Sequence, residues 1–236
     1  MKDDADDSGE NSSFPEADNE NLPASLGITD RDSGLQKAVE AKLRMIRFIS
    51  ASMPKKLDFD MPRMTLMSAF TRAQAFHDGT LDALRADNPY AAFTLLRSYA
   101  ENAAMLVYLL NKPADIERFY AEVPLEMRLR IGKLTASASS RLAGFKGVYE
   151  QLSGFAHPAD ATALSGWHSP GDELKVQWSS VPSFKNDDGF MMACVWLVEL
   201  AEANAHLWRE VWEMYFGETP RFTAPEWKFG ESQSPQ

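Results

Sequence analysis

The sequence has few of the features that mark secreted or membrane proteins. Its single cysteine, Cys194, lies in the apolar stretch 190–198, which excludes an intrachain disulfide framework and favours a buried thiol. The longest uninterrupted apolar runs, 103–110 and 190–198, fall well short of the roughly 18 residues that a membrane-spanning helix needs. Residues 1–13 lack the apolar core of a signal peptide. We therefore expect a cytoplasmic protein without a membrane span.

Several motifs that carry enzyme chemistry are also missing. The chain has no C-x-x-C pair, no Glu-x-x-His pair of the kind that holds two bridged metals, and no Gly-rich phosphate loop. Glu202 and His206, four residues apart, form a single weak metal-ligand pair. The absence of a G-x-S-x-G elbow disfavours a serine hydrolase. We expect no metal and no cofactor.

The negative charge is concentrated at one end of the sequence. The whole chain carries −10, but residues 1–32 hold ten acidic residues against Lys2 and Arg31, a charge of −8, which leaves −2 for the remainder. This first segment has almost no large apolar side chains and is predicted to be a disordered acidic tail. A nearly neutral folded part neither favours nor excludes an anionic partner.

Hydrophobic periodicity predicts a helical domain over residues 33–217, followed by a partly disordered extension over 218–236. Apolar residues recur at three and four positions from Leu35 onward, with Ser33 as the expected N-cap. The segment 88–112 is apolar on nearly every side, which is typical of a central helix. The predicted helices cover 34–52, 62–85, 88–112, 114–122, 125–137, 141–156 and 187–216.

Between 166 and 180 the pattern changes to alternation, with Leu174, Val176 and Trp178 following a Pro170–Gly171 turn. Such alternation predicts one small β-hairpin. The fold class expected from these patterns is all-α, a bundle of about five to six helices with one hairpin.

The most informative polar residues lie on the central helix. Arg97 and Glu101 are four residues apart on a helix otherwise too apolar to face water, so we expect them to point at another polar group or at a ligand. The structural alternative is an intrahelical ion pair that only fastens two helices together.

A second polar set lies near the end of the predicted helix 141–156. Tyr149, Ser153 and His157 share a face at four-residue spacing. A histidine at a helix C-terminus favours its charged form, which suits proton transfer or anion binding. The alternative is a histidine that only caps the helix.

A third candidate is the pair Arg72 and His77, whose spacing matches the R-x4-6-H motif of helical HEPN-type ribonucleases. In such a site Arg72 would bind phosphate and His77 would transfer protons. The alternative is a core histidine bonded to Gln74 or to a neighbouring helix.

The stretches LLRSYAEN and YEQLSGFAHP, some fifty residues apart, resemble the DUF5677-like proteins, bacterial helical domains of unknown function placed near the HEPN superfamily. The resemblance spans about residues 60–215 and implies a helical bundle with a site at Arg97, Glu101, Tyr149, Ser153 and His157. Unlike the HEPN nuclease motif, Arg97 has no histidine in the six residues that follow it.

Three functions fit these patterns. The first is a ligand-binding or regulatory bundle whose buried site contains Arg97, Glu101, Tyr149, Ser153 and His157, with His77 as a further candidate, for an unidentified small ligand. The second is a metal-independent ribonuclease or toxin-like defence protein, with Arg97, Glu101 and His157 as candidate catalytic residues. The third is a homodimeric interaction module that uses the hairpin or an aromatic helix face.

Overall fold

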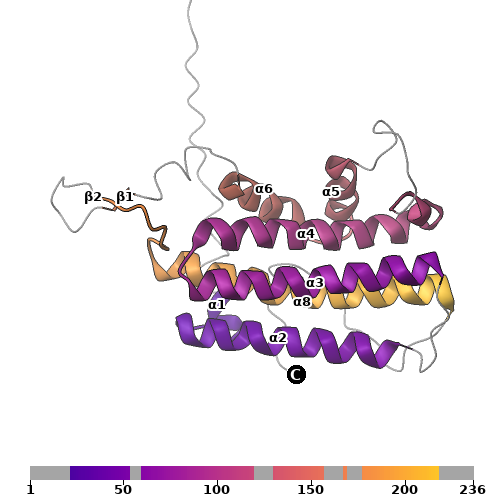
Figure 1. Cartoon of the computed structure of the whole chain (residues 1–236), viewed down its shortest axis with the longest axis horizontal. Helices are drawn as coiled ribbons and strands as arrows, with labels where there is room; N and C mark the ends of the chain where they lie inside the picture. The colour runs from indigo at the N-terminus through magenta and orange to yellow at the C-terminus, as the bar shows by residue number, and fades with distance from the viewer. Residues whose placement is uncertain (1–21, 54–59, 120–129, 157–166, 169–176, 218–236) are drawn as a thin grey trace, which may run out of the picture.

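The computed structural model describes residues 22–53, 60–119, 130–156, 167–168 and 177–217. This part of the chain is mostly helical (Figure 1). The α-helices are α1 (Leu22–Ser25), α2 (Arg31–Ser52), α3 (Met61–Arg85), α4 (Pro89–Asn111), α5 (Ile131–Ser139), α6 (Phe145–Ala156) and α8 (Asp187–Phe216). A 3-10 helix, η1 (Pro113–Phe119), follows α4, and two short strands are β1 (Trp167–His168) and β2 (Gln177–Trp178).

The four long helices begin at side-chain caps. Asp60, Asn88 and Asn186 each accept a hydrogen bond from a backbone N–H of the first turn of α3, α4 and α8. The cap of α2 is Asp30 rather than the predicted Ser33. Asp30 accepts from the N–H of Ser33, whose hydroxyl accepts from the N–H of Asp30, so Ser33 is the third residue of a capping box.

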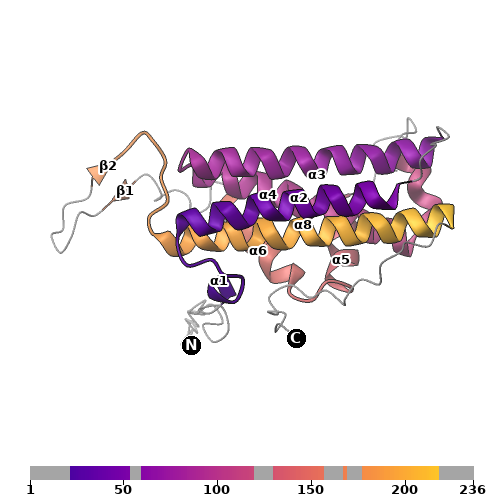
Figure 2. The same cartoon turned by 90° about the horizontal axis from the view of Figure 1, so that it is seen from below.

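The core lies around α4 and α8. Helix α8 packs against α2, α3 and α4, while α3 also packs against α4. Helices α5 and α6 cover the opposite side of α4 (Figures 1 and 2). Helix α4 is therefore enclosed on several sides, which explains why its sequence is apolar nearly all round.

The contact between α2 and α8 is close because a glycine faces the lone cysteine. A Cβ added at Gly34 would lie 2.9 Å from the Sγ of Cys194. The thiol is free and buried, as predicted, and burial raises its pKa to about 12.

Several boundaries differ from the prediction. Over the described residues the predicted helix 114–122 is the 3-10 helix η1, which begins at Pro113, and residues 120–122 lie outside the described part. Helices α5 and α6 begin at Ile131 and Phe145, later than the predicted starts at 125 and 141. Residues 125–129 lie outside the described part. The predicted hairpin over 166–180 is not seen at that length: β1 and β2 pair antiparallel over two residues each, with Trp167 opposite Trp178, and 169–176 are outside the described part.

The predicted tail is also too long. Residues 22–25 form α1, which packs against α8, and residues 26–30 lead directly into α2. The side chains of Leu22 and Ile28 are buried, so these two apolar residues offset the cost of ordering the segment. Residues 1–21 and 218–236 lie outside the described part of the chain. Among the described residues no helix is both long and apolar enough to cross a membrane.

Candidate functional site

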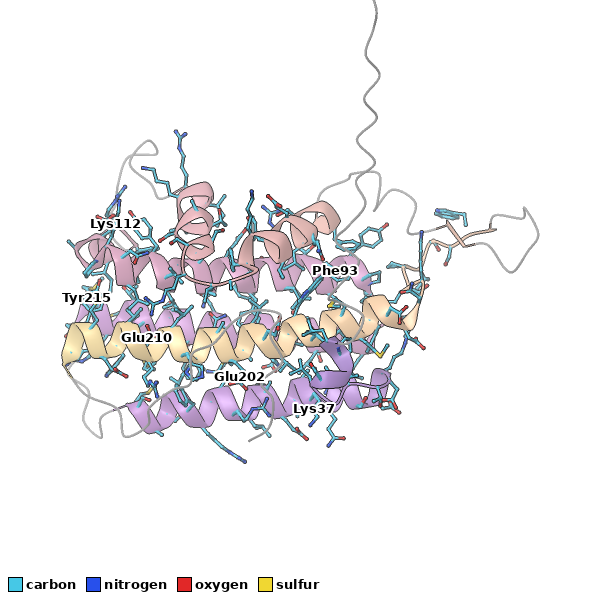
Figure 3. The ribbon with its side chains drawn as sticks, turned by 180° about the vertical axis from the view of Figure 1, so that it is seen from behind. Lys37, Phe93, Lys112, Glu202, Glu210 and Tyr215 are labelled. Atoms are coloured by element: carbon cyan, nitrogen blue, oxygen red, sulfur yellow. The ribbon has the colours of Figure 1, made fainter. Side chains whose placement is uncertain are left out.

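The candidate site lies where α6 crosses the outer face of α4. Phe93 on α4 stacks on Phe155 of α6 with ring centroids 4.1 Å apart, and Glu101, two turns further along α4, contacts Tyr149, which precedes Phe155. The two helices therefore run antiparallel. Tyr149 is flanked on α6 by Phe145, whose ring is nearly parallel to it at 5.9 Å. Figure 3 labels Phe93 on the part of α4 that lies below α6.

Three polar side chains meet between these aromatic contacts. The Nε of Arg97 lies 3.2 Å from Oε1 of Glu101 and 3.4 Å from the hydroxyl oxygen of Tyr149. The same hydroxyl donates to Oε1 of Glu101 at 2.9 Å. The guanidinium carbon lies 5.6 Å from the centre of the Tyr149 ring. The sequence prediction that Arg97 and Glu101 point at another polar group is met by Tyr149, and we call these three residues the α4–α6 cluster.

The α4–α6 cluster is only partly buried, whereas the sequence predicted a buried one. The side chains of Arg97 and Glu101 are 23% and 27% exposed. The reason is the position of α6, which covers one side of the α4 face and leaves its edge open to solvent. Partial exposure makes the ion pair cheaper to maintain than a buried one, and it leaves polar atoms within reach of a small molecule.

The environment keeps both the guanidinium and the phenol protonated. The hydrogen bond with Tyr149, with Glu101 beside it, raises the pKa of Arg97 above its ordinary value. Burial, reinforced by the nearby Glu101 carboxylate, raises the pKa of Tyr149 in spite of the opposing effect of Arg97. Neither group changes protonation near neutral pH, so these two side chains are suited to holding a ligand rather than to transferring protons.

Ser153 extends the α4–α6 cluster by one helical turn. It lies four residues after Tyr149 on α6, and its Oγ is buried without a hydrogen-bond partner among the described residues. Hydroxyls in such positions are normally satisfied, so Ser153 is a candidate contact for a ligand atom. His157 follows the end of α6 and lies outside the described residues.

His77 lies in a different place from the α4–α6 cluster. It is fully buried on α3, its Nε2 lies 2.9 Å from the carbonyl oxygen of Ala38 on α2, and its ring meets Tyr99 edge-on at 5.9 Å. Burial lowers its pKa to about 4. These contacts match the alternative stated above, a core histidine bonded to a neighbouring helix.

The R-x4-6-H pair does not form one site. Arg72 is exposed on α3 and lies over the Phe76 ring at 5.4 Å, whereas His77 points into the core. Five residues on a helix turn the chain through about 500°, so the two side chains leave it on different sides. His77 is therefore not placed to act on a phosphate held by Arg72.

A buried amide pair at the centre of the bundle was not among the residues predicted from the sequence. Asn102 on α4 donates through Nδ2 to the Oδ1 of Asn204 on α8 at 2.8 Å and to the carbonyl of Ala69 on α3 at 3.2 Å. Asn204 in turn donates to the carbonyl of Leu200 at 2.9 Å. The available signal was an asparagine at an apolar position of each of the two most apolar long helices.

A second set of contacts lies between α2 and α8, and only its Glu202 and His206 were considered from the sequence. Arg44 on α2 pairs with Glu202 at 2.8 Å, and Figure 3 shows Glu202 on the side of α8 that faces α2. One turn later, His206 meets the Phe48 ring edge-on at 4.9 Å, and the buried Arg209 lies over the same ring at 4.5 Å. Among the described residues no group of three or more His, Cys, Asp or Glu side chains converges as metal ligands would.

Comparison with known proteins adds no functional information to these contacts. No family model, curated protein or solved structure matches the chain.

Proposed function

We propose that the chain is a non-catalytic ligand-binding or regulatory protein of the cytoplasm, and that the α4–α6 cluster, with Ser153 beside it, binds a small polar ligand carrying a carboxylate or a phosphate. The observation that carries the proposal is the convergence of Arg97, Glu101 and Tyr149 from two helices at a partly exposed seam. A guanidinium offers several N–H donors in a plane, which matches the geometry of such anions.

The arrangement also explains how the site would choose its ligand. Glu101 already balances the charge of Arg97, so a bare anion gains less than it would at an unpaired guanidinium. A ligand that also donates a hydrogen bond to Glu101 or to Ser153 recovers the binding free energy that the Glu101 charge takes away. We therefore expect preference for molecules that carry an anionic group and a donor together. The resemblance to the DUF5677-like proteins belongs to this proposal and adds His157 to its list of contacts.

Thermal unfolding with a panel of small carboxylates and phosphates tests the proposal. A ligand at about one hundred times its Kd adds roughly 2.7 kcal/mol to the free energy of unfolding, which raises the Tm by about 5 to 10 °C. We expect this shift for the natural chain, and little or none for Arg97→Gln or Tyr149→Phe. Arg141→Gln is the matched control, because Arg141 pairs with Glu210 of α8 rather than with the α4–α6 cluster.

The contrary result is equally definite. If Arg97→Gln lowers the Tm by several degrees and no compound raises the Tm of the natural chain, the cluster only joins α4 to α6. The ribonuclease alternative is tested by incubating the purified protein with several RNAs. It predicts RNA cleavage that His157→Ala abolishes while leaving the fold intact. The homodimer alternative is tested by sedimentation at several concentrations, and a monomer at all of them contradicts it.

A further inference from the structure

The two most exposed large apolar side chains among the described residues lie at one end of the bundle. Trp178 and Val181 are 64% and 68% exposed, and Tyr90, at the start of α4 on the same end, is 38% exposed. Figures 1 and 2 show β2 standing out from the bundle beyond the start of α8. Exposed apolar patches on a protein surface often mark sites of interaction with other proteins.

The segment that carries these residues is held in place. Phe184 is buried and meets Phe93 and Phe190 edge-on at 5.7 and 5.2 Å, and its N–H donates to Asp87 at 3.4 Å. Five residues before Phe184, the Ser179 hydroxyl donates to the carbonyl of Val181 at 3.0 Å and accepts from the N–H of Val181 at 3.2 Å. The chain is thus anchored on the core at Phe184 and presents Val181 and Trp178 to solvent.

The same end of the bundle is acidic. Arg31 pairs there with Asp87 at 2.9 Å and with Asp187 at 2.6 Å, and Arg85 pairs with Asp82 at 3.2 Å. The termini of α2, α3 and α8 together carry six aspartates against three basic residues, a charge of −3; the residues are Asp30, Asp32, Asp82, Asp87, Asp187, Asp188, Arg31, Arg85 and Lys185. We call this surface, with Tyr90, Trp178 and Val181, the acidic apolar end.

The charge selects among the possible occupants of this surface. A second copy of the chain, related by a two-fold axis, would set one group of six aspartates against another. A nucleic acid or an anionic lipid surface would be repelled in the same way. A basic segment is attracted, and its Lys or Arg side chains can also contact the exposed Trp178 ring.

We propose that the acidic apolar end binds a basic segment of another protein, whose apolar side chains cover Trp178 and Val181 while its Lys and Arg side chains face Asp32 and Asp188. This surface lies near the end of α6, whereas the α4–α6 cluster lies nearer its start at Phe145. The proposed peptide site is therefore separate from the proposed ligand site. Either proposal can fail without the other.

Fluorescence anisotropy with labelled peptides tests the proposal on the full chain. The probe is a peptide of about twelve residues that alternates Lys and Val, and the two comparison peptides alternate Glu with Val and Lys with Gly. We expect saturable binding of the Lys–Val peptide alone, with an affinity that falls several-fold as NaCl rises from about 50 to 300 mM.

Variants locate the binding surface. Trp178→Ser combined with Val181→Ser should weaken binding at least tenfold, and Asp32→Asn combined with Asp188→Asn should weaken it several-fold and reduce its salt dependence. The control is Met64→Ser, an exposed apolar residue near the start of α3 at the other end of the bundle, which should leave affinity unchanged. Unchanged melting curves show that the exposed positions carry no folding defect.

Other outcomes overturn the proposal. Absence of binding to the Lys–Val peptide excludes a basic apolar partner, and equal binding of the Lys–Gly peptide reduces the surface to a charge effect. If sedimentation shows a dimer that Trp178→Ser dissociates, the occupant is a second copy of the chain.

Discussion

At the scale of single residues, His77 makes the stability of the fold depend on pH. Its pKa falls from an ordinary 6.5 to about 4 in the folded chain because the ring is buried. Between these values the unfolded chain binds a proton that the folded chain does not, so the free energy of unfolding decreases as pH falls from about 6.5 to 4. One such histidine contributes at most about 3 kcal/mol over that range. Urea unfolding at a series of pH values measures the slope.

The variant His77→Leu isolates this contribution. It fills the core position with an apolar side chain and removes the titrating ring, so the loss in the free energy of unfolding between pH 7 and 4.5 should become smaller than in the natural chain. His206, whose pKa burial also lowers, provides the comparison: His206→Leu should reduce the slope as well, through a different site. A slope unchanged by His77→Leu would show that the His77 ring titrates normally in the folded protein.

At the scale of helices, the Asn102–Asn204 hydrogen bond joins α4 to α8 inside the core. Replacing one partner leaves the other amide buried without its hydrogen bond, which costs about 1 to 3 kcal/mol, whereas replacing both leaves no polar group to satisfy between them. We expect Asn102→Leu and Asn204→Leu each to destabilise the fold, and the double variant to lose less than the two losses added together. A double-mutant cycle in urea makes the measurement, and simple additivity would show that the two amides act independently.

The long helices could be predicted from the sequence because their signals are local. Prolines and capping side chains sit within one turn of the predicted ends of α3, α4 and α8, and the apolar spacing between them is regular. The start of α2 was predicted three residues late, because Ser33 is itself a good cap and only the folded backbone shows that Asp30 takes that role. Local sequence therefore restricts a helix end to a few candidates, and hydrogen bonding selects among them.

The candidate site could be predicted only in part, for a reason that also lies at this scale. Spacing places Arg97 and Glu101 on one face of α4, and a charge on an apolar helix needs a polar partner. That the partner is Tyr149, and that the pair stays partly exposed, depends on where α6 crosses α4, which no local pattern encodes. Asn102 and Asn204 lie 102 positions apart in the sequence, so their hydrogen bond likewise depends on the packing of whole helices.

At the scale of the whole molecule, the layering predicts how stability is distributed. Helices α4 and α8 form the interior and share an almost wholly apolar contact, while α5 and α6 are short and pack on one side only. Opening α5 and α6 would uncover the outer face of α4 but leave its contacts with α3 and α8 in place. The outer pair therefore costs less free energy to open than the central pair.

Native-state hydrogen exchange followed by mass spectrometry reads this difference directly. Amides in the middle of α4 and α8, around Leu96 and Leu200, should exchange only through global unfolding and show the highest protection. Amides of α5 and α6 should exchange faster, and Tyr149→Phe should speed exchange in α6 without changing that of α8, because Tyr149 is the polar link between α6 and α4. Uniform protection across all helices, or equal effects of Tyr149→Phe on α6 and α8, would show instead that the two layers open as one cooperative unit.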